Sequence, residues 1–331
     1  MLALGKLLEL TLAGREPCEK VQLTPRGVKL HWLADGALLV TPPSGQDQGL
    51  DLLLSAGIHG NELIPIHVLD RLVRALARGE VQPRARLLLL FANPAAMRRM
   101  VRQVEHDLNR LFRGEHADLW GEEAIRAAEL EALVSSFFGA PGRTRRHYDL
   151  HSAMRTSRLA QFAICPWREK DSLPPDALAR LQGLAIQGVL LQRQPTSTFS
   201  AMTVARHGAE AFTVELAEGG PEALLPAVAQ FERGMIAMIE GRDWPVSGQP
   251  PRLLQISRAV IKRSPRFRLC VPENIENFAS LPVGMVLAED DGARWVVDEP
   301  DACILFPMAD VAEGQRAALI VVPLAQAEAE R

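Results

Sequence analysis

The chain has 331 residues, 47% of them hydrophobic, so it can bury a sizeable core, and its length favours one large domain with a smaller one. Its formal net charge of −3 gives no basic surplus, which argues against a nucleic-acid partner. No apolar run approaches the roughly 18 residues that a membrane span needs, so no membrane association is expected.

The cysteines give an expectation about the cellular compartment. None of the four belongs to a CxxC pair, and their spacing suits neither a zinc ribbon nor a disulfide framework: Cys18, Cys165, Cys270 and Cys303. The apolar start of the chain is interrupted by charged residues and lacks a signal-peptide cleavage site. Isolated thiols without an export signal predict a cytoplasmic protein.

Short apolar runs along the first two thirds of the chain predict buried β-strands. They span residues 50–55, 86–92, 147–150, 161–165, 186–191 and 211–216. Strands that are apolar throughout, rather than at every second residue, are typical of parallel sheets covered on both faces.

Three longer segments, 63–77, 122–138 and 221–240, are predicted to be helices. In 63–77 the apolar residues that recur at helical spacing are Ile66, Leu69, Val73 and Leu76. In 122–138 the residues expected to face the core are Ile125, Leu130, Leu133 and Val134. Pro221 suits the first turn of the third helix. This alternation predicts an α/β fold with a mixed, mostly parallel sheet covered by helices.

The composition changes at residues 241–252, where the sequence GRDWPVSGQPPR is rich in glycine and proline. Short strand-like pieces separated by turns follow it, at 253–261, 267–271, 285–288, 294–297, 304–306 and 318–322. We therefore expect a large α/β domain over 1–245 and a small β-rich C-terminal domain over 246–331.

Three polar motifs stand where predicted strands end. His59 and Glu62 lie in the glycine-flanked turn GIHGNE, His151 in DLHS, and Glu215 in TVEL. Ligands of open α/β sheets bind outside the carboxyl ends of the strands, so these side chains are expected to converge. Two histidines and one carboxylate suit a catalytic zinc with one position open for water. Glu215 would then be the general base.

Each of these residues alone has an ordinary explanation. A histidine in a turn or at a strand end is commonly structural, and Glu62 could simply favour the first turn of a helix. Glu215 is harder to explain in this way, because an unpaired carboxylate within a buried strand is costly. The shared position of the motifs, rather than any single residue, carries the prediction.

The ordered motifs resemble a known family. GIHGNE at 57–62, NP at 93–94, DLNR at 107–110, DLHSA at 149–153 and VEL at 214–216 are similar to the succinylglutamate desuccinylase and aspartoacylase family of zinc carboxypeptidase-like hydrolases. The DLHSAMR stretch and the FP-containing tail look closer to the desuccinylases. The resemblance implies a zinc-carboxypeptidase-like fold in which 1–245 is the zinc-dependent hydrolase domain, followed by a C-terminal β domain, and one Zn²⁺ per subunit.

The resemblance also implies a role for each matching residue. His59, Glu62 and His151 match the zinc ligands, and Glu215 matches the catalytic glutamate. Three further matches concern the substrate: Arg102 would polarise the scissile carbonyl, and Asn109 with Arg110 would hold a substrate carboxylate. Arg155 follows the His151 motif and is expected to bind a second carboxylate. Asp149, two residues before His151, could orient its imidazole or have only a strand-end role.

The implied reaction is hydrolysis of N-succinyl-L-glutamate to succinate and L-glutamate, the last step of the arginine succinyltransferase pathway. One departure counts against an N-acetylaspartate substrate: aspartoacylases bind substrate with a C-terminal tyrosine, whereas the only tyrosine here is Tyr148. The alternatives are a deacylase of another N-acyl amino acid, a short-chain carboxypeptidase, or a metal-binding scaffold without catalysis. The expected partner is a small acidic N-acyl amino acid, with a homo-oligomer possible.

Overall fold

The computed structural model describes residues 3–153, 155–169, 173–174, 176–216, 226–243 and 249–324. The large sheet holds β1 (Val21–Leu23), β2 (Lys29–Ala34), β3 (Ala37–Thr41), β4 (Leu50–Ala56), β5 (Arg86–Phe91), β6 (Thr144–Ser152), β7 (Phe162–Cys165), β8 (Gly188–Leu191), β9 (Glu210–Leu216), β10 (Arg252–Ile261), β14 (Cys303–Leu305) and β15 (Arg316–Pro323). A small separate sheet holds β11 (Arg268–Leu269), β12 (Val286–Asp290) and β13 (Ala293–Val296).

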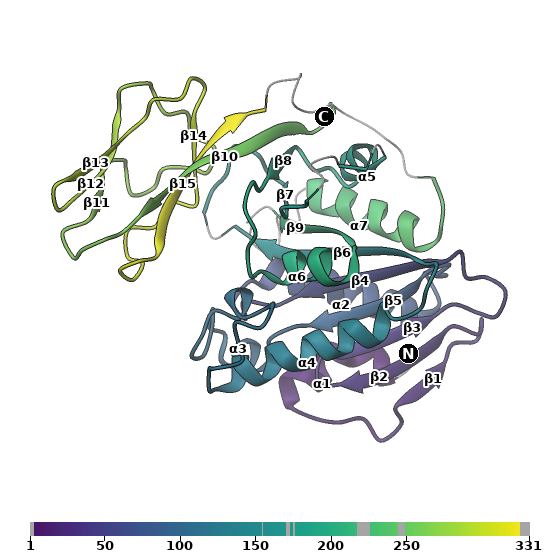
Figure 1. Ribbon diagram of the computed structural model, residues 1–331. Helices are drawn as coiled ribbons and strands as arrows, with labels where there is room; N and C mark the ends of the chain where they lie inside the picture. Colours follow the sequence, from purple (N-terminus) through teal and green to yellow (C-terminus); the bar gives the residue numbers. More distant parts are fainter. Residues whose placement is uncertain are drawn as a thin grey trace.

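The helices surround the large sheet (Figure 1). They are η1 (Ala3–Lys6), α1 (Leu7–Ala13), α2 (Leu63–Arg78), α3 (Pro94–Arg99), η2 (Leu108–Arg110), α4 (Glu122–Phe137), α5 (Ala177–Gly183), α6 (Phe199–His207) and α7 (Pro226–Ile239). Within the described part of the chain, no helix is long and apolar enough to cross a membrane.

The strand order places the site-bearing strands together. The large sheet runs β1-β2-β3-β5-β4-β6-β9-β7-β8-β10-β15-β14, and β5, β4, β6 and β9 are parallel neighbours at its centre. Their carboxyl ends therefore meet at one edge, as expected from the apolar strand pattern. The α/β class with a helix-covered, largely parallel sheet is confirmed.

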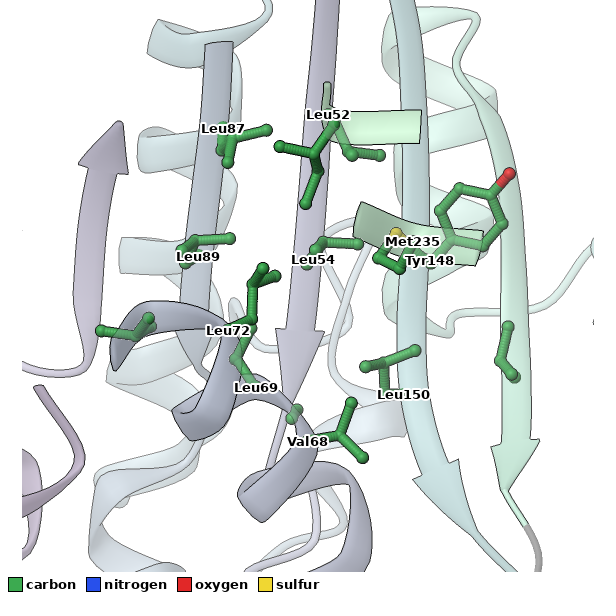
Figure 2. Close-up of a cluster of buried hydrophobic side chains, with 14 of the residues drawn as sticks. Leu52, Leu54, Val68, Leu69, Leu72, Leu87, Leu89, Tyr148, Leu150 and Met235 are labelled. Carbon is green, nitrogen blue, oxygen red and sulfur yellow. The ribbon is translucent and has the colours of Figure 1, made fainter. Parts of the chain in front are cut away.

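Two apolar layers enclose these central strands. Leu52 and Leu54 of β4 pack with α2 and α7 on one face, whereas Leu53 packs with α4 and α6 on the other. Figure 2 shows the first layer, in which Leu69 and Leu72 of α2 lie over the strands. Because successive side chains of a strand point to opposite faces, alternate leucines supply both layers.

Most predicted elements are present, but the structure also contains elements that the sequence did not predict, among them the helices α1, α3, α5 and α6. Ile125 was expected to face the core, but it is 68% exposed, while Leu130 and Val134 of the same helix are buried. Glu123 takes the inward position instead, and its side chain is fully buried. The N-terminal strands β1 to β3 were not predicted, and they extend the sheet by antiparallel pairing to β5. The predicted helix start at Pro221 lies outside the described residues, and α7 is described from Pro226.

The C-terminal strands continue the large sheet rather than standing apart from it. β10 pairs parallel with β8, and β15 pairs antiparallel with β10. Beyond this junction, residues of β10 to β15 form a hydrophobic cluster of their own, which includes Val260, Leu287 and Ile320. Figure 1 shows these strands projecting beyond the helices.

Candidate active site

The structure brings together the three predicted metal ligands. One ligand atom from each of His59, Glu62 and His151 lies within 4.8 Å of the others, and all three side chains are buried. Glu62 lies between the two imidazoles: its Oε1 is 2.7 Å from Nδ1 of His59, and its Oε2 is 3.1 Å from Nδ1 of His151. Two imidazoles and a carboxylate at this separation form a donor set that suits zinc.

Strand pairing places Glu215 beside this cluster. β6 and β9 are parallel neighbours, and His151 is the register partner of Glu215. Side chains that are paired across parallel strands project from the same face, so Glu215 and His151 point the same way. Both residues belong to the last pleats of their strands rather than to the loops that follow.

Each imidazole uses its second nitrogen to contact an aspartate. Nε2 of His59 is 3.1 Å from Oδ1 of Asp107, and Nε2 of His151 is 3.0 Å from Oδ2 of Asp149. An aspartate that accepts a proton from one ring nitrogen leaves the other nitrogen, here Nδ1, free to bind a metal. The sequence suggests this orienting role for Asp149, but it does not predict one for Asp107. Its one sequence signal is that it opens the DLNR motif.

Close backbone packing positions the turn that carries His59. A Cβ at Gly60 would lie 2.2 Å from the carbonyl carbon of Ala96, so α3 can approach this closely only because residue 60 is glycine. Asn93 accepts a hydrogen bond from the amide of Ala96 and donates one to the carbonyl of Ile58. The asparagine of the NP motif therefore joins the metal-binding turn to the start of α3.

A second buried carboxylate positions the loop of Asp107. Glu123 of α4 accepts hydrogen bonds from the backbone amides of Val104 and Glu105, at 2.6 and 3.2 Å. These hydrogen bonds explain why Glu123, rather than Ile125, points from α4 towards the protein interior. They also fix the chain two residues before Asp107.

The charges of the cluster favour a bound cation. Burial opposes ionisation of Glu62, but His151 and His59 lower its pKa well below the usual range. Burial by itself would lower the pKa of His151, but the negative charges of Asp149 and Glu62 outweigh burial and raise that pKa well above its usual value. The carboxylates around His151 therefore favour a positive charge at this position, which a divalent metal ion would supply.

Glu215 has the electrostatic properties of a proton acceptor near neutral pH. Only 8% of its surface is exposed, and burial raises its pKa to about 7, with His151 acting in the opposite direction. A general base works best when its pKa lies near the operating pH. The two buried glutamates therefore differ: the pKa of Glu215 is raised, whereas that of Glu62 is lowered.

Arg102 borders the cluster, whereas Asn109 and Arg110 follow Asp107 in the short helix η2. Nη1 of Arg102 lies 3.6 Å from Oε1 of Glu62, with the side chain 41% exposed, so the guanidinium borders both the cluster and solvent. Asn109 is buried, and its Oδ1 accepts a hydrogen bond from the amide of Phe199 at 2.9 Å, which leaves its NH₂ group to donate elsewhere. Arg110 is exposed and donates to the carbonyl of Asn109.

Arg155 contacts the C-terminal strands. Its Nη1 donates to the backbone carbonyls of Glu273 and Ile275, the latter at 3.2 Å. These bonds tie the chain after β6 to the segment before β12, and its substrate-binding role stays a prediction. Tyr148 is fully buried on the face of the sheet opposite to the cluster, beside Met235 of α7 (Figure 2), so it is not available to bind a substrate.

A hydrogen-bonded network lies behind the cluster. Ser55 of β4 donates to Oδ1 of Asp149 at 2.6 Å, and its Oγ is 2.9 Å from Nε2 of His147. Nδ1 of His147 is 3.0 Å from Oγ1 of Thr203 in α6. These buried groups hold Asp149 in the orientation that contacts His151.

We expect Asp149→Asn to weaken metal binding about 10- to 100-fold, the usual cost of losing a carboxylate that orients a ligating histidine. The asparagine can keep the bond from Ser55 but no longer carries the negative charge beside His151. Competition with a chromophoric chelator measures the metal affinity directly. Asp47→Asn, at a partly exposed ion pair with Arg143, is the matched control. An unchanged affinity in Asp149→Asn would remove the carboxylate from this role.

The buried His147 predicts a loss of stability in acid. Burial lowers its pKa to about 4, so the imidazole stays neutral in the folded protein, whereas it takes up a proton near pH 6.5 in the unfolded chain. Between pH 6.5 and 4 the unfolded state binds more protons, so this group lowers the free energy of unfolding as the pH falls, by roughly 3 kcal/mol.

Urea unfolding of metal-free protein at pH 7, 6 and 5 measures this slope. His147→Gln keeps a polar side chain that does not titrate, so we expect a shallower loss of stability in acid than for the unaltered chain. Equal slopes for the two proteins would show that His147 is already protonated in the fold.

Comparison with known proteins identifies the family of this chain. The model of the succinylglutamate desuccinylase/aspartoacylase catalytic domain matches residues 48–241, and that of the AstE/AspA barrel-sandwich hybrid domain matches residues 249–324. Two relatives named succinylglutamate desuccinylase cover 98% of this chain. The protein of Pseudomonas fluorescens (strain Pf0-1) is 50% identical over 98% of its own length, and that of Pseudomonas paraeruginosa is 53% identical over 99%.

Solved structures show the same fold. The succinylglutamate desuccinylase of Chromobacterium violaceum superposes with a TM-score of 0.83 at 33% identity, over 96% of this chain and 98% of that one. The succinylglutamate desuccinylase of Vibrio cholerae gives a TM-score of 0.86 at 28% identity, over 96% and 94% of the two chains. The chain therefore belongs to the succinylglutamate desuccinylase/aspartoacylase family.

Proposed function

We propose that this chain is a zinc-dependent hydrolase that cleaves the amide bond of N-succinyl-L-glutamate and releases succinate and L-glutamate. The buried cluster of His59, Glu62 and His151, with Glu215 paired to His151 across the sheet, carries the proposal. Relatives about 50% identical over nearly their whole length and named succinylglutamate desuccinylase support the choice of substrate.

Zinc is the metal that this donor set favours. His59, Glu62 and His151 would hold it, and the ion would supply Lewis acidity to the site. Asp107 and Asp149 keep the two imidazoles oriented, as described above. We propose one zinc ion per subunit.

Each side chain around the cluster has a separate role in the hydrolysis. Glu215 takes a proton from water as the water oxygen bonds to the acyl carbon, and it returns the proton to the amine nitrogen as the carbon–nitrogen bond breaks. Arg102 donates to the carbonyl oxygen as negative charge develops there. Asn109 and Arg110 hold a substrate carboxylate and so fix the amide bond in the site.

The domain division and the cellular location belong to the same proposal. We place the hydrolase domain at residues 1–245 and a small β-rich domain at 246–331, supported by the separate hydrophobic cluster of β10 to β15. All four cysteines are free, which supports a reducing compartment and hence a cytoplasmic enzyme.

A substrate panel tests the proposal. Purified protein with its metal content measured is assayed with N-succinyl-L-glutamate, N-acetyl-L-aspartate and a dipeptide. We expect zinc in the protein and a kcat/KM for N-succinyl-L-glutamate at least about 100-fold above the others, as losing a paired carboxylate contact implies. Preference for N-acetyl-L-aspartate would indicate an aspartoacylase-like deacylase. No turnover of any substrate at full metal occupancy would indicate a scaffold.

A further inference from the structure

His147 lies on the face of β6 that carries the metal side of the site. His147, Asp149 and His151 stand two residues apart along the strand, so their side chains project from the same face. In the neighbouring strand β4, Ser55 is the register partner of Asp149 and projects from that face too. His147 and Ser55 are fully buried, and neither belongs to the cluster of candidate metal ligands. Polar side chains are costly to bury without partners, so the contacts that these two make indicate their role.

The hydrogen bond between Ser55 and His147 has a definite direction. Ser55 has one hydroxyl proton, which it donates to Asp149, so its oxygen can only accept from Nε2 of His147, 2.9 Å away. Burial lowers the pKa of His147 to about 4, so the imidazole carries a single proton at neutral pH, and that proton lies on Nε2. Successive donors therefore run from His147 through Ser55 to Asp149, whose other oxygen contacts His151.

The helix α6 holds the other side of the His147 ring. The hydroxyl of Thr203 lies between Nδ1 of His147 and the carbonyl of Ser200, at 3.0 and 2.8 Å, and it can donate to either. The imidazole also meets the ring of Phe199 edge-on, with centroids 4.8 Å apart. Contacts from β4 and from α6 therefore fix both the position and the orientation of this ring.

Phe199 connects the same imidazole to the proposed substrate side of the site. Its backbone amide donates to Oδ1 of Asn109 at 2.9 Å, and its ring stacks on that of Phe112, with centroids 4.5 Å apart. Asn109 belongs to η2, and Phe112 follows this short helix. The position of Asn109 therefore depends on where Phe199 lies, and the ring of His147 is one of the two aromatic rings that hold Phe199 in place.

We propose that His147 is a positioning residue that acts on both halves of the active site. On the metal side, its Nε2 acts through Ser55 on the orientation of Asp149. On the substrate side, its ring acts through Phe199 on the position of Asn109. This inference rests on the proposed function and deepens it, because it assigns a part in metal and substrate binding to a side chain outside the cluster of ligands and the proposed substrate contacts.

Three variants separate the two connections. Ser55→Ala removes only the connection to Asp149. His147→Gln can place an amide nitrogen near the former Nε2 and so keep the bond to Ser55, but it removes the aromatic contact with Phe199. His147→Asn is too short to reach Ser55, so it removes both connections. His207→Gln is the matched control, because His207 is a partly buried histidine at the end of α6 that takes no part in these contacts.

Competition with a chromophoric chelator measures the metal side without any substrate. We expect Ser55→Ala and His147→Asn each to weaken zinc binding about 3- to 10-fold, less than the roughly 10- to 100-fold expected for a direct partner of a ligating histidine. His147→Gln and the control should stay within about twofold of the unaltered protein. Combining Ser55→Ala with His147→Asn should cost no more than either change alone, because both act on Asp149 through one series of hydrogen bonds.

Kinetics at saturating zinc measure the substrate side. The KM for N-succinyl-L-glutamate should rise about 3- to 10-fold in His147→Gln and His147→Asn, because both lose the ring that holds Phe199 beside Asn109. It should stay within about twofold in Ser55→Ala and in His207→Gln, which keep that ring. Ser55→Ala and His147→Gln are thus expected to give opposite results, a loss of zinc affinity alone and a rise in KM alone.

Thermal unfolding checks that each variant is folded, and a general loss of packing gives a different pattern. Unchanged zinc affinity in Ser55→Ala, or a loss in His147→Gln as large as in His147→Asn, would overturn the proposal. Additive losses in the double variant, or an unchanged KM in both His147 variants, would do the same. If His147→Asn does not fold, the opposite results expected for Ser55→Ala and His147→Gln decide by themselves.

Failure of the proposed function gives a separate result. An unaltered protein that binds zinc but does not hydrolyse N-succinyl-L-glutamate would show that the substrate assignment is wrong. The zinc affinities then decide on His147, since they are measured without substrate. A loss of affinity in Ser55→Ala that His147→Gln does not share supports the positioning role, and equal affinities in all variants overturn it.

Discussion

Replacing Glu215 with glutamine is expected to lower kcat for N-succinyl-L-glutamate about 10²- to 10⁴-fold and to leave the bound metal unchanged. Glutamine has nearly the same shape but cannot accept a proton. Glu215 lies beside His151 in the strand register yet outside the cluster of candidate metal ligands. The loss should therefore fall on the chemical step rather than on the metal site.

Succinate release and metal analysis of the same Glu215→Gln preparation measure both effects. Glu122→Gln is the matched control, because Glu122 is exposed and pairs with Arg99 at 2.8 Å on the protein surface. Full turnover by Glu215→Gln would exclude Glu215 as the general base. Loss of metal together with activity would instead make Glu215 part of the metal site.

Replacing His151 with alanine is expected to abolish stoichiometric metal binding and activity together. The substitution removes one of three ligands and leaves the buried carboxylates of Glu62 and Asp149 without the imidazole that lies between them. The affinity should fall by more than the roughly 10- to 100-fold that loss of an outer hydrogen bond costs. The unpaired buried charges should also destabilise the fold.

Chelator competition, activity and thermal unfolding test this expectation in parallel. His67→Ala is the control, since His67 is an exposed histidine of α2 outside the cluster. Added zinc should raise the unfolding temperature of the unaltered protein and of the control, because a ligand that binds only the folded state stabilises it. A His151→Ala variant that still bound one zinc ion with unchanged affinity would refute the assignment of this ligand.

Local patterns made the central part of the fold predictable. Runs such as LDLLLS and RLLLLF can be buried on both faces only within a covered parallel sheet, and the strands β4 and β5 lie there. Helical spacing placed Ile66, Leu69 and Val73 correctly in the core. The same spacing placed Ile125 in the core wrongly. Glu123 is buried at that point instead, because its carboxylate binds the backbone of the loop before Asp107.

The candidate metal ligands were also predictable, for a related reason. His59 and Glu62 follow β4, His151 lies at the end of β6, and parallel strands bring such positions to one edge. Asp107 was not predictable from spacing. It lies in an irregular loop whose position depends on Glu123 and on the approach of α3 to Gly60, and neither contact follows from a local pattern.

The sequence by itself determined the α/β class, the central parallel strands and the polar residues at their carboxyl ends, since these depend on periodicity and on the geometry common to all parallel sheets. Only the tertiary structure decided that β10 pairs with β8 and that His59 and His151 each contact an aspartate. These contacts join segments that are far apart in the chain. Packing of the whole molecule sets them, and no local spacing of residues encodes that packing.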